Sequence, residues 1–188
     1  MNQKNFFANY IQVLEAIEHC EEKNLLTPAL VMLYSAIDSV SWLASGDNQE
    51  SGKAFRRWVS DWMLKDPKIK CNAGELYAAR CGLVHTLTPT SNLTKKGTRK
   101  VAYSWGTGDN SHLEKLINRL GHEPELVSVH LSDLIQSFRN GMADYLQYVY
   151  QDPQRMKAFD EKCGQHFTTL SIERVEEAMT LLGLSGTK

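Results

Sequence analysis

The segment that most constrains this chain spans residues 27–44, which are apolar almost all round a helix. Thr27 can cap such a helix, and Pro28 suits its first turn, where a missing N–H costs nothing. A helix that is hydrophobic on nearly every side has to be covered by its neighbours. The sequence therefore predicts a central helix with other helices packed around it. Its main stripe holds Leu30, Leu33, Ile37, Val40 and Ala44, and its other sides hold Val31, Tyr34 and Trp42.

Asp38 is the single charged residue within this predicted helix. A buried carboxylate without a partner is costly, so we expect a basic side chain against it. Arg80, farther along the chain, is the obvious candidate. Such a pair either orients a functional arginine or satisfies a structural one, and the sequence leaves both open.

Further segments carry apolar residues at the spacing of amphipathic helices. The first stops in the charged run at residues 21–24, and Asp66 with Pro67 ends the third. Asn72 and Glu75, three residues apart, predict a capping box for a fourth helix. A long helix is expected over residues 131–150. The apolar positions of the first helix are Phe6, Tyr10, Val13, Leu14 and Ile17. Those of the third helix are Phe55, Trp58, Val59, Trp62 and Met63. Those of the long helix are Leu134, Ile135, Phe138, Met142, Tyr145, Leu146 and Val149.

A small β-structure is expected between the fourth helix and the long one. Residues 100–105 alternate in the manner of a strand, and residues 127–130 can pair with them. A short helix over residues 113–120 separates the two. We therefore predict a mainly α fold, an antiparallel helical bundle with a small β-hairpin insertion.

Asp152 and Pro153 introduce two short C-terminal helices. The last is expected to stop at Gly183 and to turn its apolar stripe inward. The chain is thus expected to form one domain over residues 1–188, with a core at about 5–150 and a helical extension at 152–184. The stripe of the last helix consists of Ile172, Val175, Ala178, Met179 and Leu182.

The fourth helix carries Arg80 and His85 near its C-terminal end. An arginine fork fits two phosphate oxygens, and histidine is the usual side chain for proton transfer near neutral pH. Residues five apart lie about 140° apart around a regular helix, so the two do not share a narrow face. Arginine's long stem, a looser turn at Gly82 or a second copy of the chain can bring them together. The pair predicts catalysis on a phosphodiester, with both residues as catalytic candidates.

A structural role is the alternative for this pair. Arg80 can form an ion pair with Glu75 or Asp38, while His85 caps the C-terminal end of the helix. Cys81 lies four residues before His85 and shares its face, so it is a candidate supporting residue together with Asp38. Spacing alone decides neither interpretation.

Charge is distributed unevenly along the chain. Residues 45–104 hold eleven basic and five acidic side chains, a net charge of +6, whereas the remainder carries −7. This asymmetry is typical of a nucleic-acid surface, although a solvated mixed surface also produces it. Within the basic part, a lysine-rich turn either binds an RNA backbone or forms a solvated loop tip. Its candidate RNA-binding residues are Lys95, Lys96, Arg99 and Lys100.

Other functional patterns are weaker. Phe55, Trp58 and Trp62 can stack on bases, but their helical spacing favours the core. The four cysteines are widely spaced, which indicates reduced, mostly buried thiols, and we expect neither a metal nor a cofactor. No apolar run suits a signal peptide or reaches the length of a membrane span, so we expect a cytoplasmic protein without membrane contact.

With these residues in place, the chain resembles the HEPN superfamily, the higher eukaryotes and prokaryotes nucleotide-binding domains. The resemblance rests on Arg80-Cys-Gly-Leu-Val-His85 and on the buried helix over residues 30–44 with its Ser35 and Asp38. It covers residues 5 to about 150. It implies an all-helical domain that forms a homodimer around the motif helices.

The resemblance also implies an activity. Active members are metal-independent endoribonucleases of toxin or phage-defence systems, in which the histidine acts at the ribose 2′-hydroxyl and the arginine stabilises the phosphorane. His85 and Arg80 would take these roles, with RNA as substrate and an antitoxin or other protein as a possible partner. Cys81 stands where active members usually have a polar residue, often Asn. Since some members are catalytically silent, the alternative is a dimeric helical module that binds a nucleotide or a protein.

Overall fold

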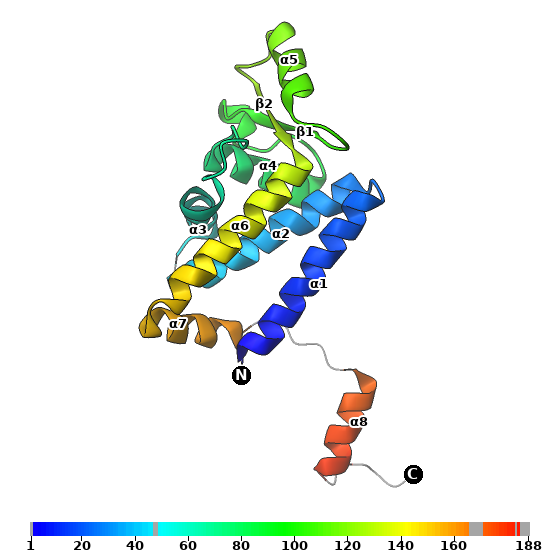
Figure 1. The fold of residues 1–188 in the computed structure, drawn as a ribbon, viewed down its shortest axis with the longest axis vertical. Helices are drawn as coiled ribbons and strands as arrows, with labels where there is room; N and C mark the ends of the chain where they lie inside the picture. The colour runs from blue at the N-terminus through cyan, green and yellow to red at the C-terminus, as the bar shows by residue number, and fades with distance from the viewer. Residues whose placement is uncertain (1, 47–48, 166–170, 183, 185–188) are drawn as a thin grey trace.

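The computed structural model describes residues 2–46, 49–165, 171–182 and 184, and these residues form a mainly helical fold (Figure 1). The predicted mainly α class is confirmed. In chain order the elements are α1 Asn2–Glu22, α2 Leu26–Ala44, α3 Ser51–Trp58, the π-helical turn η1 Val59–Met63, α4 Ala73–Thr86, the 3-10 turn η2 Thr94–Lys96, β1 Lys100–Ser104, α5 Ser111–Arg119, β2 Leu126–His130, α6 Leu131–Tyr150, α7 Pro153–Cys163 and α8 Ile172–Leu181.

Helix α2 is the centre of the fold, as its apolar surface predicts. It packs against α1, α3, α4, α6 and α7. By length and composition alone, α2 is also apolar enough to cross a membrane, so the expectation that no segment reaches that length was wrong. Half of its apolar window is buried inside this fold.

The start of α2 differs from the prediction. Leu25, not Thr27, is the N-cap residue, and it makes no side-chain capping bond. The chain turns directly out of α1, with Asn24 in the left-handed region at φ 56° and the Leu25 N–H donating to the carbonyl of Cys20. This tight connection places Thr27 inside the first turn, where it cannot act as a cap.

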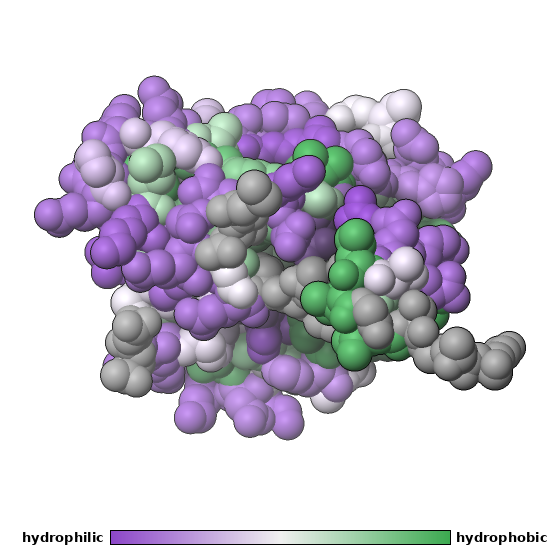
Figure 2. All heavy atoms as spheres, turned by 90° about the horizontal axis from the view of Figure 1, so that it is seen from below, coloured by the Kyte–Doolittle hydropathy of each residue, from purple (hydrophilic) through white to green (hydrophobic). Residues whose placement is uncertain are grey.

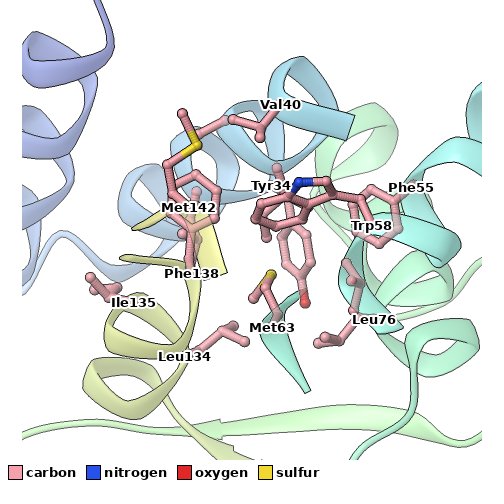
Figure 3. Packing of buried hydrophobic residues seen from close by; sticks show 14 of the residues in the cluster. Tyr34, Val40, Phe55, Trp58, Met63, Leu76, Leu134, Ile135, Phe138 and Met142 are labelled. Carbon is pink, nitrogen blue, oxygen red and sulfur yellow. The ribbon is translucent and has the colours of Figure 1, made fainter. Parts of the chain in front are cut away.

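Large side chains from α2, α3, η1, α4 and α6 meet in one core (Figure 3). Phe55 and Trp58 are buried, as their helical spacing predicts, and the Trp58 ring lies edge-on to Phe138 with centroids 5.8 Å apart. Tyr34 extends the core toward the sheet, where its hydroxyl lies 2.5 Å from that of Tyr103. Burial of these rings supplies the main stabilisation of the fold.

The junction of η1 and α6 is unusually close. The Ser137 hydroxyl donates to the carbonyl of Met63 at 2.6 Å. A Cβ at Gly141 would lie 3.0 Å from the backbone of Trp62, so glycine allows α6 to approach the π-helical turn. The approach brings Trp62 against the aromatic side chains of α6.

The two strands pair in parallel, so the predicted β-hairpin was wrong. Their register runs from Lys100 opposite Leu126 to Ser104 opposite His130. A hairpin needs a tight reversal, but here α5 carries the chain back to the starting end, which is how parallel strands are connected. Asn110 bridges the strands by hydrogen bonds to the hydroxyls of Ser104 and Ser128.

The C-terminal helices differ in packing. Helix α7 buries Phe159 and Cys163, and Phe159 lies edge-on to Phe6 at 5.6 Å. Helix α8 instead lies apart from the bundle (Figure 1), and all of its described side chains are exposed, so the expectation that its stripe faces inward was wrong. Seen from the end where α8 lies, the surface is mainly hydrophilic with separate hydrophobic patches (Figure 2). Residues 166–170 and Gly183 of the predicted extension lie outside the described residues.

Candidate functional site

Helix α4 is defined by caps at both ends. The Asn72 side chain accepts from the Glu75 N–H at 3.0 Å, and the Glu75 carboxylate accepts from the Asn72 N–H at 2.8 Å, which confirms the predicted capping box. The helix then continues to Thr86 and ends at Leu87, a left-handed residue at φ 52°. Both candidate catalytic residues therefore lie on regular helix.

Arg80 pairs with Asp38 of α2, the partner predicted from the single charge of that helix. Its Nε donates to the Asp38 carboxylate at 2.6 Å, and the two side chains are 20% and 25% exposed. Burial lowers the pKa of Arg80, but the hydrogen bond and the charge of Asp38 outweigh it, so the pKa lies above its usual value. Arg80 is a permanent cation held in one orientation.

The same guanidinium reaches His85. Arg80 Nη1 lies 2.9 Å from His85 Nε2, and because arginine can only donate, Nε2 accepts and carries no proton. The imidazole in this contact is therefore neutral, with its proton on Nδ1. His85 is exposed, so its nitrogens lie close to solvent.

The end of α4 is closed by the backbone of Leu87, whose N–H bonds to the carbonyls of Gly82 and Leu83. Helix α4 runs without a break through Gly82, so the contact between Arg80 and His85 needs no looser turn there. Gly82 is buried, and a Cβ there would lie 2.5 Å from the carbonyl oxygen of Thr88, so glycine lets the chain fold back over the end of α4. The long arginine stem alone makes the contact, within one chain.

Tyr77 is a neighbour that the sequence analysis missed. Burial and then Cys81 raise the pKa of its hydroxyl, while Arg80 and Arg56 act in the opposite direction. The Arg56 guanidinium lies 4.9 Å from the centre of the Tyr77 ring. Tyr77 precedes Cys81 by four residues, and this spacing is the signal that could have revealed it.

A hollow of about 420 Å³ opens beside Arg80, between α2, α3 and α4. We call it the Arg80 hollow. Asp38 and Arg80 contribute its charges, and several hydroxyls and an amide contribute hydrogen-bonding groups, so it can hold a polar anionic ligand. Its lining consists of Ser35, Asp38, Ser39, Trp42, Ser45, Gln49, Ser51, Ala54 and Arg80.

The structure does not gather the predicted RNA-binding residues at this hollow. Arg99 Nε donates to the Glu75 carboxylate at 2.6 Å, so it neutralises a buried acid at the first turn of α4, five residues before Arg80. Lys95 and Lys96 are exposed on η2. Lys100 is half-buried at the start of β1.

The cysteines and acids do not form a metal site within the described parts of the chain. All four cysteines are free, two of them buried and two half-buried. No group of three or more His, Cys, Asp or Glu side chains is arranged to hold a metal ion in residues 2–46, 49–165, 171–182 and 184.

Comparison with protein-family models, with curated proteins and with solved structures finds no match. The fold and the site therefore define a class only in structural terms. The chain is a mainly helical domain in which a central-helix aspartate holds an arginine against an exposed histidine. The resemblance to the HEPN superfamily stays a prediction that rests on Arg80, His85 and the order of the helices.

Proposed function

We propose that this protein is a HEPN-like, metal-independent endoribonuclease of the toxin or phage-defence type, which acts as a homodimer. The observation that carries the proposal is the 2.9 Å contact between Arg80 Nη1 and Nε2 of an exposed His85. A phosphate binder and a neutral base are thus adjacent, beside a hollow that can hold a ligand. An antitoxin or other protein partner fits the same proposal.

The pair suits cleavage through the ribose 2′-hydroxyl. The Arg80 guanidinium has five N–H donors, and Asp38 and His85 take one each, which leaves donors for phosphate oxygens. A phosphate bound there draws the guanidinium from Nε2, which can then accept the 2′-hydroxyl proton. The 2′-oxygen attacks the phosphorus, Arg80 stabilises the charged phosphorane, and the bond from phosphorus to the 5′-oxygen breaks. The 5′-oxygen takes a proton from solvent water, and the protonated His85 returns its proton to solvent. The products are a 2′,3′-cyclic phosphate and a 5′-hydroxyl.

Asp38 acts through Arg80 in this scheme. Its carboxylate fixes the Nε edge of the guanidinium, and Nη1 contacts His85. A side chain locked by a neighbouring hydrogen bond delivers its charge in one geometry. Asp38 is therefore a positioning residue and not a catalytic one.

A non-catalytic binding module is the second candidate. The observation that favours it is the low exposure of Arg80, 20%, together with its bond to Asp38. Cys81, with only weak hydrogen-bonding capacity, fits the same interpretation. In that case RNA or a nucleotide binds at the Arg80 hollow and is not cut.

The test is incubation of the purified chain with labelled RNA in EDTA. Wild type is expected to cleave, and His85→Ala and Arg80→Ala are each expected to lose at least about 100-fold in rate. His122→Ala is the matched control, because His122 is another exposed histidine, in the segment between α5 and β2. Cleavage that survives His85→Ala at the rate of the His122→Ala control would refute the proposal, as would no cleavage by wild type.

A further inference from the structure

A second hollow, of about 140 Å³, lies beside the Arg80 hollow at the junction of α2, α3, η1 and α6. We call it the aromatic hollow, after the four rings in its wall: Trp58, Trp62, Tyr145 and Tyr148. Ser45, Gln49 and Ala54 line both hollows, so the two share a wall. Its volume is well below the roughly 300–1,000 Å³ of pockets for drug-sized ligands, so it suits a single ring system.

Trp58 provides an independent sign of a ligand. Its side chain is 2% exposed, and its Nε1 is buried without a hydrogen-bond partner among the described residues. Trp58 and Ser41 of α2 both line the hollow, and Figure 3 shows the Trp58 indole among the packed side chains of the core. A buried N–H without a partner is unfavourable, so an acceptor atom bound beside Trp58 would be stabilised.

The polar part of the wall offers further hydrogen bonds. The Ser41 and Ser45 hydroxyls donate to the carbonyls of Ile37 and Trp42, which leaves their oxygens as acceptors. Gln49 adds an amide that both donates and accepts. Flat rings beside a mixed set of donors and acceptors match the faces and edges of a nucleobase.

The charges at the aromatic hollow are paired. Arg57 and Asp61 line it, and Arg57 Nε lies 3.6 Å from the Asp61 carboxylate. The Lys65 ammonium lies 5.0 Å from the centre of the Trp62 ring and the Arg155 guanidinium 3.7 Å from that of Tyr148, and these cations pair with Asp144 and Asp152. Because they already occupy ring faces that would otherwise attract an ammonium ligand, the hollow suits an uncharged ring.

The two hollows lie side by side, as the phosphate and the base of one nucleotide do. Asp38 lines the Arg80 hollow and Ser41 lines the aromatic hollow, and the two residues are three positions apart on α2, about 5 Å along its axis. A phosphate at Arg80 and its base in the aromatic hollow would therefore be neighbours. We infer that the aromatic hollow binds the nucleobase next to the scissile phosphate, so the enzyme selects its RNA site by base. This inference rests on the proposed function, because it takes the Arg80 hollow as the phosphate site.

The test is nucleotide binding, measured by tryptophan fluorescence with AMP, GMP, CMP and UMP, and with ribose 5-phosphate as a probe without a base. At least one nucleotide is expected to bind about 10-fold more tightly than ribose 5-phosphate. Tyr148→Leu is expected to weaken that nucleotide about 10-fold, since stacking on an aromatic ring contributes that much. Tyr150→Leu is the matched control, because Tyr148 and Tyr150 are 45% and 50% exposed on the same helix and only Tyr148 lines the hollow.

Trp58→Phe adds a second readout, since it removes the N–H and keeps a ring. It is expected to reduce the preference among the four nucleotides, with a melting curve to show that the variant is folded. Equal binding of ribose 5-phosphate and the nucleotides overturns the inference, and so do equal affinities in Tyr148→Leu and Tyr150→Leu. None of these measurements needs cleavage. RNA cleavage without base binding would refute this inference and leave the proposed ribonuclease in place. Base binding without cleavage would refute the proposed ribonuclease and leave the nucleobase site in place.

Discussion

At the scale of single residues, the contacts that link Asp38 to Arg80 and Arg80 to His85 support the proposed function. One charge in an apolar helix was enough to predict the Asp38–Arg80 pair, because a buried carboxylate needs a partner. The contact of Arg80 with His85 was not predictable from spacing, since it depends on how far the arginine stem reaches around the helix. The partner of Glu75 was also missed. Arg99 takes that place, and its approach depends on the turn before β1 rather than on local spacing.

Asp38→Asn tests the positioning role of that aspartate. The amide keeps the size of the side chain but removes the charge that holds Arg80 Nε, so we expect the rate of RNA cleavage to fall about 100-fold, as for a misplaced catalytic group. The midpoint of thermal unfolding should change by only a few degrees, because the pair is partly exposed to solvent. Asp109→Asn, on an exposed acid between β1 and α5 that lines neither hollow, is the control. Equal rates in the two variants would contradict the role.

Cys71 predicts how stability depends on pH. Burial, with the nearby Glu75 charge, raises the pKa of its thiol from 9.0 to about 12. The unfolded chain therefore loses this proton near pH 9, while the folded chain keeps it until about pH 12, so folding becomes less favourable as pH rises through that window. Between pH 8 and pH 10 the free energy of unfolding should fall by about 1.4 kcal/mol more in wild type than in Cys71→Ala. Urea titrations at both pH values measure this, and equal decreases would contradict it.

At the scale of elements, local sequence patterns predicted the helices correctly. They did not predict features that depend on residues far apart in the chain, such as the direction of a strand. The capping box of α4 needs only Asn72 and Glu75, and the helical period of α6 lies within its own residues. The direction of β2 depends instead on the path of α5, so the same strand pattern suits a hairpin and a parallel pair. The two hollows could not be predicted from the sequence for a related reason, because each lies between separate helices. At the aromatic hollow, for example, Gly141 lets α6 come close to the backbone of Trp62, which lines the hollow.

Helix α8 carries the clearest prediction at this scale. The spacing of its apolar residues correctly indicates a helix, but no described side chain of α8 is buried. Removal of residues 166–188 should therefore change the midpoint of thermal unfolding by less than about 2 °C. Removal of residues 152–188 is the comparison, because it also deletes the buried Phe159 and Cys163 of α7 and should lower the midpoint strongly. A large decrease from the shorter deletion would show that α8 stabilises the bundle.

At the scale of the whole molecule, the proposed homodimer and the site inside each chain make separate predictions. The Arg80–His85 contact forms within one chain, so each protomer carries a complete pair. Arg80→Ala and His85→Ala chains, unfolded together and refolded as a mixture, should therefore regain no RNA cleavage. Sedimentation of the mixture would show whether dimers have formed. Recovery of activity in mixed dimers would mean that the pair acts across the interface.

The central claim is that Arg80 and His85 cut RNA at the ribose 2′-hydroxyl without a metal. Its most direct measurement is the chemistry of the ends that wild type produces in EDTA, by mass spectrometry of one RNA and of the same RNA with 2′-deoxyribose at the cut position. We expect a 2′,3′-cyclic phosphate and a 5′-hydroxyl from the RNA, and no cut at the deoxy position. A 3′-hydroxyl with a 5′-phosphate, or cleavage of both substrates, would contradict it.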